Sequence, residues 1–404
     1  MISSERPNGA LSAAVAPSLL REMNQRLLLD HLFTGGPAIR PQLARDTGLS
    51  LPTVIAALAG LEQVGLVRTT GRTRTAHGRP AATYEADPTS GAVVGVDIGH
   101  DWIHLLVADL AGTKLSRLDV RNTARSANAL VERTRTAVAD ATTAAGLAPS
   151  AITHTVIGSP GVYDTRRGRI QYAANLPGWQ RVGLAEALTQ RLGTSITIDN
   201  DANLAALGEH TYGAARNAVD FVYLTIGTGV GLGLVLDGRL YRGATGVAGE
   251  AGYLPIGDRL SQPRPGHAAR GMLEENLAAD AVVRYAQEAG LPETLTAEQV
   301  FTAARSGDPQ ALTAVTQEAK HLARLVATIL PLFDPELIVL GGGVGQNLDL
   351  LEPPMRESLA LLSPMTPRLK VGDLGRDAVV MGAVATGIAT ARDTVFKQRI
   401  ERAG

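Results

Sequence analysis

The stretch "VVGVDIGHDWIHLLVADLAGTKL" (residues 93–115) decides the fold, because it reads as an apolar strand, a glycine-bearing turn and a second apolar strand. The same plan returns in "DFVYLTIGTGVGLGLVLDGRLY" (220–241), where strand, glycine turn, strand, Asp and turn follow in the same order. A supersecondary unit that occurs twice in one chain predicts two similar lobes with a cleft between them.

Three turns in the chain bear on phosphate binding. "GTGVGLG" (227–233) has four glycines and Thr228, and its backbone N–H groups can hold phosphate, although close packing of strands explains such glycines nearly as often. "ELIVLGGGVG" (336–345) predicts a buried strand running into a turn that opens a helix, which suits a nucleotide or simply a tight turn. The first turn differs, because it contains His100 and Asp101, and a carboxylate repels phosphate.

Amide and carboxylate side chains gather at the end of another predicted strand. In "ITIDNDANLAALGEH" (196–210) a β-rich run ends at Asp199, Asn200 and Asp201, and a helix follows. Strand ends that face a cleft are where α/β proteins bind ligands, and Asn and Asp together can hold vicinal hydroxyl groups. Asp201 can cap the helix, which is the plain structural role, or accept the proton of an attacking hydroxyl group.

Residues 18–85 have the pattern of a helix-turn-helix module. "SLLREMNQRLLLDHL" (18–32) predicts a first helix, "RPQLARDTG" (40–48) a second, and "TGLS" (47–50) the turn into a third helix, which would enter the major groove. The residues at helical spacing in the first helix are Leu20, Met23, Leu27 and His31 or Leu32. Those on the buried face of the third helix are Val54, Leu58 and Leu61.

The segment after the third helix predicts a basic wing. "GLVRTTGRTRTAHGRPAATYEAD" (65–87) reads as two strands, and no acidic residue lies between Glu62 and Glu85. Arginine forks suit phosphate oxygens, and the recognition helix offers only short polar side chains, so much of the affinity for DNA is expected from phosphate contacts. Use of the same module for protein contacts is the alternative. The expected DNA-binding residues are Ser50, Thr53, Arg68, Arg72, Arg74 and Arg79.

Composition limits the classes of function. The 404 residues are 45% apolar and contain no cysteine, so two or three domains are expected without disulfides or thiolate metal sites. The net charge is −1, but the head has eight arginines against five acidic residues, which indicates that the head alone meets a polyanion. Neither a signal peptide nor a membrane span is expected, which fits a cytoplasmic protein. The expected parts are a disordered lead-in (1–17), the head (18–85), a linker (86–91), a first lobe (92–212, completed by a helix at 377–402) and a second lobe (213–376).

Residues 92–404 resemble the ROK family of bacterial sugar kinases and sugar-responsive repressors. The stretches that carry the resemblance are "IGSPGVYD" (157–164), "IDNDANLAALGE" (198–209), "IGTGVGLGLVLDGRLYRGATGVAGEAGY" (226–253) and "IVLGGGVG" (338–345). The resemblance implies an α/β fold, a two-lobed actin-like ATPase (ribonuclease H-like) domain of the sugar-kinase type, and the winged head resembles the repressor branch. It also implies a sugar pocket, with Asp201 where the kinases keep their catalytic base. The residues that it implies for this pocket are Ser159, Gly161, Asn175, Asn200, Asp201, Glu250, Tyr253 and Glu274.

The sequence departs from the family at two places. Family kinases have a second glycine and a threonine where this chain has His100 and Asp101, so catalysis with ATP is not expected and Asp201 becomes a vestigial base. The family's structural zinc site uses three cysteines and a histidine, whereas this chain has Tyr253 in the histidine's place and only His267 in the following loop. We therefore expect neither a metal nor a cofactor.

These observations predict a sugar-responsive, DNA-binding transcriptional regulator, a repressor of carbohydrate uptake or catabolism genes. Its expected partners are operator DNA, a sugar or sugar-phosphate effector, and further copies of itself in a homodimer or homotetramer, since two heads would read a roughly palindromic site. An active sugar kinase with a DNA-binding head is the alternative, and a regulator that responds to a protein partner is a third possibility.

Overall fold

The structure is a computed structural model, and it describes residues 17–74, 80–164, 166–173, 176, 178–258 and 270–402. Nearly all of the expected lead-in at 1–17 lies outside these ranges, as do Arg79, Asn175 and His267.

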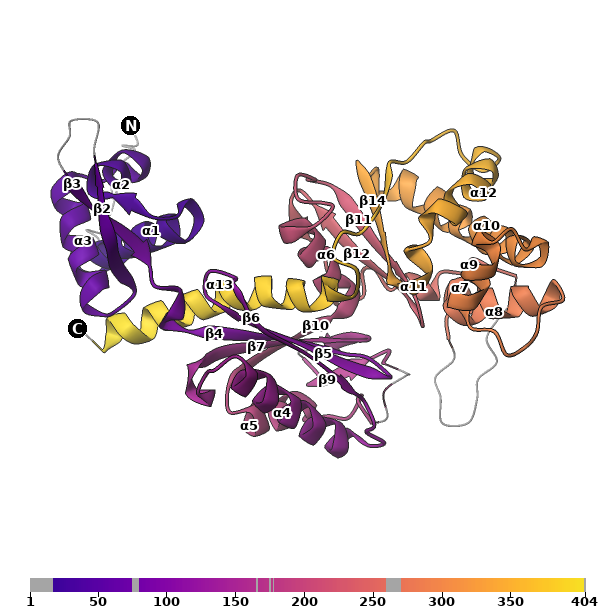
Figure 1. Ribbon diagram of the computed structural model, residues 1–404, viewed down its shortest axis with the longest axis horizontal. Coiled ribbons are helices and arrows are strands. Elements are labelled where there is room, and N and C mark those ends of the chain that lie inside the picture. Colours follow the sequence, from indigo (N-terminus) through magenta and orange to yellow (C-terminus); the bar gives the residue numbers. More distant parts are fainter. Residues whose placement is uncertain are drawn as a thin grey trace, which may run out of the picture. The chain divides into compact units, whose positions relative to one another are not determined.

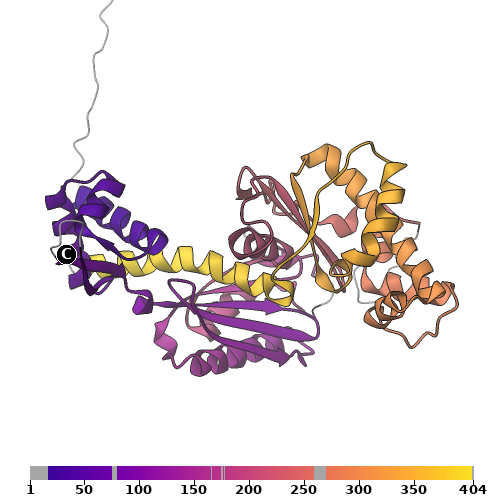
Figure 2. The same cartoon turned by 45° about the horizontal axis from the view of Figure 1, so that its top comes forward.

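The chain forms two compact units (Figures 1 and 2). One unit, the head, consists of Met1–Gly91 with Arg392–Gly404, and the other, the body, consists of Ala92–Ala391.

The head has the element order of a winged helix-turn-helix. Its elements are α1 (Pro17–Gly35), β1 (Ala38–Ile39), α2 (Arg40–Thr47), α3 (Leu51–Gln63), β2 (Val67–Arg74), β3 (Pro80–Ala86) and the 3-10 turn η1 (Pro88–Ser90), and the strands pair in the order β1-β3-β2. The turn between α2 and α3 is short for two reasons. Gly48 adopts the left-handed conformation (φ 71°), and Ser50 caps α3 by accepting the amide N–H of Thr53.

The first helix packs with a different face from the one that its spacing indicates. Leu20, Met23 and Leu27 are 51%, 56% and 44% exposed. Leu32, which the spacing allowed as the alternative to His31, is buried, and so is Leu28. Three consecutive leucines at 27–29 give α1 two overlapping apolar faces. Contacts with α2 and α3 select the second face, so the buried stripe is shifted by one residue.

The end of the chain also belongs to the head. The last helix, α13 (Ala378–Glu401), was expected to complete the first lobe over 377–402, but its residues from Arg392 onward group with the head. The guanidinium group of Arg399 gives the physical reason, because it donates three hydrogen bonds to backbone carbonyl oxygens. The acceptors are Val64, Gly65 and Ser90, at 2.9–3.0 Å.

The first lobe of the body is built on a five-stranded mixed sheet, in the order β10-β7-β4-β5-β6. Its strands are β4 (Ala92–Ile98), β5 (Trp102–Asp109), β6 (Lys114–Arg121), β7 (Ile152–Ser159) and β10 (Ser195–Asn200). The helices α4 (Ala127–Ala144) and α5 (Leu184–Leu192) pack on this sheet. The turn η2 (Pro149–Ala151) and the hairpin of β8 (Val162–Asp164) and β9 (Arg169–Gln171) complete the lobe.

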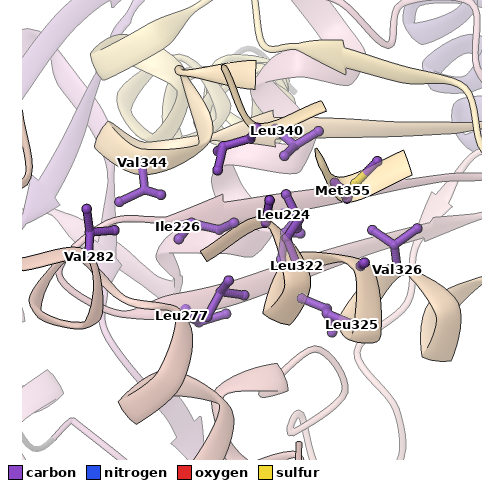
Figure 3. Close-up of a cluster of buried hydrophobic side chains, with 14 of the residues drawn as sticks. Leu224, Ile226, Leu277, Val282, Leu322, Leu325, Val326, Leu340, Val344 and Met355 are labelled. Atoms are coloured by element: carbon purple, nitrogen blue, oxygen red, sulfur yellow. The ribbon is translucent and has the colours of Figure 1, made fainter. Parts of the chain in front are cut away.

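The second lobe has a sheet of the same size, in the order β13-β12-β11-β14-β15. Its strands are β11 (Phe221–Ile226), β12 (Val230–Leu236), β13 (Arg239–Leu240), β14 (Leu337–Gly341) and β15 (Leu369–Val371). Its helices and 3-10 turns are η3 (Ala251–Tyr253), α7 (Met272–Leu277), α8 (Ala279–Glu288), α9 (Ala297–Arg305), α10 (Pro309–Phe333), α11 (Gly342–Gly345), α12 (Leu348–Ala360) and η4 (Gly375–Asp377). Figure 3 shows how Leu322 and Val326 of α10 meet Leu224 of β11 in the core, so this helix serves the core of its lobe.

The two sheets share one topology, which confirms the predicted internal repeat. In each, an antiparallel hairpin (β4–β5 or β11–β12) has a parallel strand beside its first strand (β7 or β14) and an antiparallel strand beside its second (β6 or β13). A further parallel strand, β10 or β15, closes the far edge.

Two helices of the body cross in backbone contact. A Cβ atom on Gly382 of α13 would lie 1.7 Å from the carbonyl oxygen of Leu204, and one on Gly208 of α6 (Asp201–Tyr212) would lie 2.3 Å from that of Ala378. Only glycine permits this approach, which fixes the start of α6, where the polar cluster lies. By length and composition alone residues 375–401 would suffice to cross a membrane, but 56% of their most apolar window is buried in the protein, as in a core helix.

Candidate functional site

A cavity of about 720 Å³ lies in the body and is walled by both lobes. The elements around it are the tips of the β4–β5 and β11–β12 hairpins, the junction of β10 with α6, the turn at 249–253, and the starts of α7 and α11. This volume falls within the range of small-molecule sites (~300–1,000 Å³).

Asn200 anchors the junction between β10 and α6. Its Oδ1 accepts the amide N–H of Asn203 at 3.1 Å and so caps α6, while its Nδ2 donates to the carbonyl oxygen of Gly161 at 3.2 Å. Asn200 therefore takes the capping role that the sequence left open for Asp201. The side chain of Asp201 lines the cavity instead.

Asp201 is a carboxyl group in a poorly solvated place. Burial raises its pKa to about 6, against the opposing effect of the Ala202 N–H, which donates to Oδ1 at 2.8 Å, and with help from the charge of Glu274. A group that titrates near neutral pH can accept or donate a hydrogen bond to a sugar hydroxyl group.

Glu250 and Glu274 line the same cavity. Burial, and then the charges of Asp201 and Glu274, raise the pKa of Glu250 to about 7. Glu274 is different, because Arg270 holds it in an ion pair (Nε to Oε1, 2.8 Å). Arg270 also contacts Asp280 at 2.9 Å and donates to the carbonyl oxygen of Thr228 at 2.8 Å. We did not predict Arg270, because nothing in the sequence of its loop distinguishes this arginine from the others there.

Tyr253 lies on the cavity wall and is 45% exposed. Its ring meets that of Tyr172 edge-on, with 5.6 Å between centroids. Two aromatic rings therefore frame this part of the wall.

Asp97, at the carboxyl end of β4, is a cavity residue that the site prediction omitted. Burial, and then the charge of Asp201, raise its pKa to about 7. Its position at a strand end, like that of Asp201, was the available sequence signal.

Of the two predicted pocket residues Ser159 and Gly161, only Gly161 lines the cavity. Gly161 lines the cavity, and its left-handed backbone (φ 80°) places a would-be Cβ atom 2.1 Å from the carbonyl oxygen of Gln171. Ser159 is buried and is absent from the cavity wall, because its hydroxyl group accepts the indole N–H of Trp179 at 2.5 Å and donates to Pro160. Its role is to hold the strand end, and the prediction that it lines the pocket is corrected.

The first hairpin turns tightly, with the amide of Gly99 donating to the carbonyl oxygen of Trp102 at 2.9 Å. His100 lines the cavity, whereas Asp101 does not, and the two side chains pair (Nδ1 to Oδ1, 2.9 Å). At the second hairpin, Thr228 lies on the cavity wall between two glycines.

The described residues contain no group of three or more His, Asp or Glu side chains that could hold a metal ion. The loop that contains His267 lies outside the described ranges.

In the head, the predicted recognition residue Ser50 is exposed and Thr53 is half-buried, and their hydroxyl groups are 2.8 Å apart at the start of α3. Arg68 forms an ion pair with Glu85 of the neighbouring strand, at 2.6 Å. Arg72 and Arg74 lie on β2, closer to the tip of the hairpin. Of the predicted wing arginines, Arg68 is thus already neutralised.

Comparison with known proteins assigns the family. The ROK family profile matches residues 93–388, and the chain belongs to the ROK family. The expected two-lobed α/β fold of the sugar-kinase type is confirmed by this match together with the sheet topology.

Named relatives divide into kinases and repressors. The chain is 34% identical to a glucokinase of Thermotoga maritima over 246 residues (57% of this chain, 77% of that protein). It is 26% identical to a xylose repressor of Caldicellulosiruptor bescii over 390 residues (92% of this chain, 97% of that protein).

Solved structures divide in the same way. A ROK family transcriptional regulator, described as a homologue of the Escherichia coli MLC protein, has a TM-score of 0.76 at 21% identity and covers 94% of this chain and 99% of its own. A ROK glucokinase of Streptomyces griseus, solved with glucose and AMPPNP, has a TM-score of 0.63 at 29% identity and covers 74% of this chain and 99% of its own.

Proposed function

We propose that this protein is a sugar-responsive transcriptional repressor, whose head binds operator DNA and whose body binds a sugar effector. The proposal rests on how much of the chain each named relative covers. The repressor-named relative aligns over 92% of the chain, the head included, whereas the glucokinase match covers 57%. The proposed setting is the cytoplasm, and the proposed assembly is a homodimer or homotetramer that presents two heads to a palindromic site.

The sugar is held through hydroxyl groups in this proposal. Asn200, Asp201 and Glu250 line one cavity, and carboxylate and amide oxygens are strong acceptors for vicinal hydroxyl groups. Gly161 and Tyr253 complete the pocket, and Glu274 contributes through its ion pair with Arg270. Asn175, outside the described residues, stays a predicted contact. Bound sugar shifts the balance between body conformations and thereby alters the affinity of the head for DNA.

The proposed DNA contacts are Ser50 and Thr53 at the start of the recognition helix and the wing arginines Arg72, Arg74 and Arg79. Short hydroxyl side chains read few base edges, so the arginines are assigned most of the affinity.

The protein lacks kinase activity in this proposal. His100 takes a cavity position at the first hairpin, where kinases of the family have small residues, so a sugar hydroxyl group beside Asp201 has no bound phosphoryl donor to attack. Active phosphorylation is the second candidate, because a glucokinase relative is 34% identical to this chain over 246 residues.

A thermal-shift screen with sugars, sugar phosphates and ATP, followed by an ATP-consumption assay, tests the proposal. A ligand at ~100 times its Kd adds about 2.7 kcal/mol to stability, so true effectors stand out. The proposal expects stabilisation by a sugar and no sugar-dependent ATP consumption. Sugar-dependent ATP consumption that Asp201→Asn abolishes would establish the kinase instead.

A further inference from the structure

We propose that the arm of the cavity next to the first hairpin is a subsite for a second, uncharged sugar ring, so that the effector is a disaccharide or longer saccharide. The inference rests on the proposed sugar response of this same cavity. It is carried by the side chains that β5 and β6 present to the cavity, which the sugar pocket at Asn200 and Asp201 does not use.

The cavity runs without interruption from the carboxyl cluster to this arm. Asp97, which lines the cavity together with Asp201, pairs in register with His104 of β5, and His104 pairs with Asp119 of β6. Asp97, His104 and Asp119 all line the cavity. A ligand held at Asp201 thus has this row of side chains directly beyond it.

Trp102 supplies the flat apolar surface that a sugar ring stacks on. It lines the cavity, is 37% exposed, and lies parallel to the His104 ring within 14°, with 6.4 Å between centroids. Arg121 covers one face of the Trp102 ring, with 4.2 Å from its Cζ to the centroid, so a sugar ring would stack on the opposite face. Because Nδ1 of His104 is bound to Asp119 at 2.5 Å, the ring nitrogen left for a ligand hydroxyl group is Nε2.

The charges of the arm favour a neutral ligand over a phosphate. Two carboxyl groups, Asp97 and Asp119, face it. The guanidinium group of Arg117 is already paired with Asp119 and Asp377, and that of Arg121 lies over Trp102. Among the described residues, the other arginines on the cavity wall are Arg270, which is paired with Glu274 and Asp280, and Arg376, which lies exposed at the surface. A triphosphate or sugar phosphate would meet more negative than available positive charge.

Calorimetry of the full chain with matched sugars tests this subsite: glucose against maltose and cellobiose, and xylose against xylobiose. We expect the best disaccharide to bind about tenfold tighter than its monosaccharide, a difference of about 1.4 kcal/mol. Trp102→Ala should abolish this gain and change monosaccharide affinity by less than about twofold. Trp102→Phe should keep part of the gain.

Tyr241→Ala, at a similarly exposed aromatic residue outside the cavity, is the matched control and should bind both sugars as wild type does. If Trp102→Ala proves unstable, Trp102→Leu keeps the apolar bulk without the flat ring and decides the same question. Monosaccharide binding with no disaccharide gain, or an equal loss for both sugars in Trp102→Ala, would overturn the subsite and leave the proposed function standing. Failure of every saccharide to bind would refute the proposed sugar response itself.

Discussion

Arg270, four residues before Glu274, forms an ion pair with it, with Nε 2.8 Å from Oε1, on the wall of the cavity that Asp201 also lines. This ion pair places one positive charge among carboxyl groups that would otherwise repel one another. The ionisation of the carboxyl groups in the cavity at neutral pH therefore depends on Arg270, which itself need not touch the ligand.

Removing this charge should shift the pH dependence of sugar binding. In Arg270→Gln, Glu274 loses its partner, so ionisation of Asp201 and Glu250 becomes harder and their pKa values rise further. We expect weaker binding at pH 7 and a binding midpoint at higher pH, measured by calorimetry from pH 5 to pH 9 with the tightest sugar. Asp280→Asn, which removes the exposed partner of Arg270, is the control and should change little. An unchanged pH profile in Arg270→Gln would speak against the argument.

Asp201→Asn should weaken the sugar response by about ten- to a hundredfold, because charge-assisted hydrogen bonds contribute roughly 1.5–3 kcal/mol each and ~1.4 kcal/mol is a factor of ten. The change keeps the size of the side chain and replaces one acceptor oxygen by a donor. Operator binding without sugar should stay near wild type, since Asp201 and the head belong to different compact units. Glu293→Gln, at an exposed position away from the cavity, is the matched control. An intact sugar response in Asp201→Asn would remove Asp201 from the site.

The unliganded protein should lose stability as the pH rises. Glu250 has its pKa raised from 4.5 to about 7, so between these values the folded state binds more protons than the unfolded state, and the free energy of unfolding falls with increasing pH. Asp97 and Asp201 act in the same direction. Thermal unfolding at pH 5.5 and pH 8 should show a smaller loss in Glu250→Gln than in wild type. Equal losses in the two proteins would mean that Glu250 titrates normally.

The wing should supply phosphate contacts through its outer arginines. Arg72→Ala combined with Arg74→Ala should weaken binding to every DNA sequence and lower the salt slope of log K by about 2 per head, because each phosphate contact contributes ~0.9. Arg68→Ala is the matched control on the same strand, since Glu85 already neutralises Arg68 at 2.6 Å. Binding is measured by fluorescence anisotropy at several salt concentrations. A slope that the double variant leaves unchanged would argue against the wing as a phosphate contact.

Local sequence signals predicted the elements of this protein well where one interaction determines the outcome. The face formed by Val54, Leu58 and Leu61 is fully buried as predicted, and Ser50 caps α3. The repeated glycine hairpins indicated two lobes, and the sheets do share one topology. In each case the period of apolar residues or the geometry of a turn leaves little choice.

Elsewhere the outcome depended on partners distant in sequence. Leu27 and Leu28 are equally apolar, and only packing in the head determines that Leu28 is the buried one. Ser159 had the right motif for the pocket, but the indole of Trp179 engages its hydroxyl group. The side chain of Asp101 pairs with that of His100 and does not line the cavity. A single sequence cannot reveal these pairings, because each depends on side-chain directions set by the tertiary fold.

The central claim is that sugar bound in the body controls DNA binding by the head. The most direct test selects a duplex for the full-length protein from a random DNA pool and then measures its affinity by anisotropy with and without the sugars found in the screen. The account predicts specific binding and a shift in affinity of at least about tenfold, or ~1.4 kcal/mol, by a sugar, with the shift lost in Asp201→Asn. A protein that binds sugar with no change in DNA affinity, or that selects no DNA sequence at all, would contradict the account.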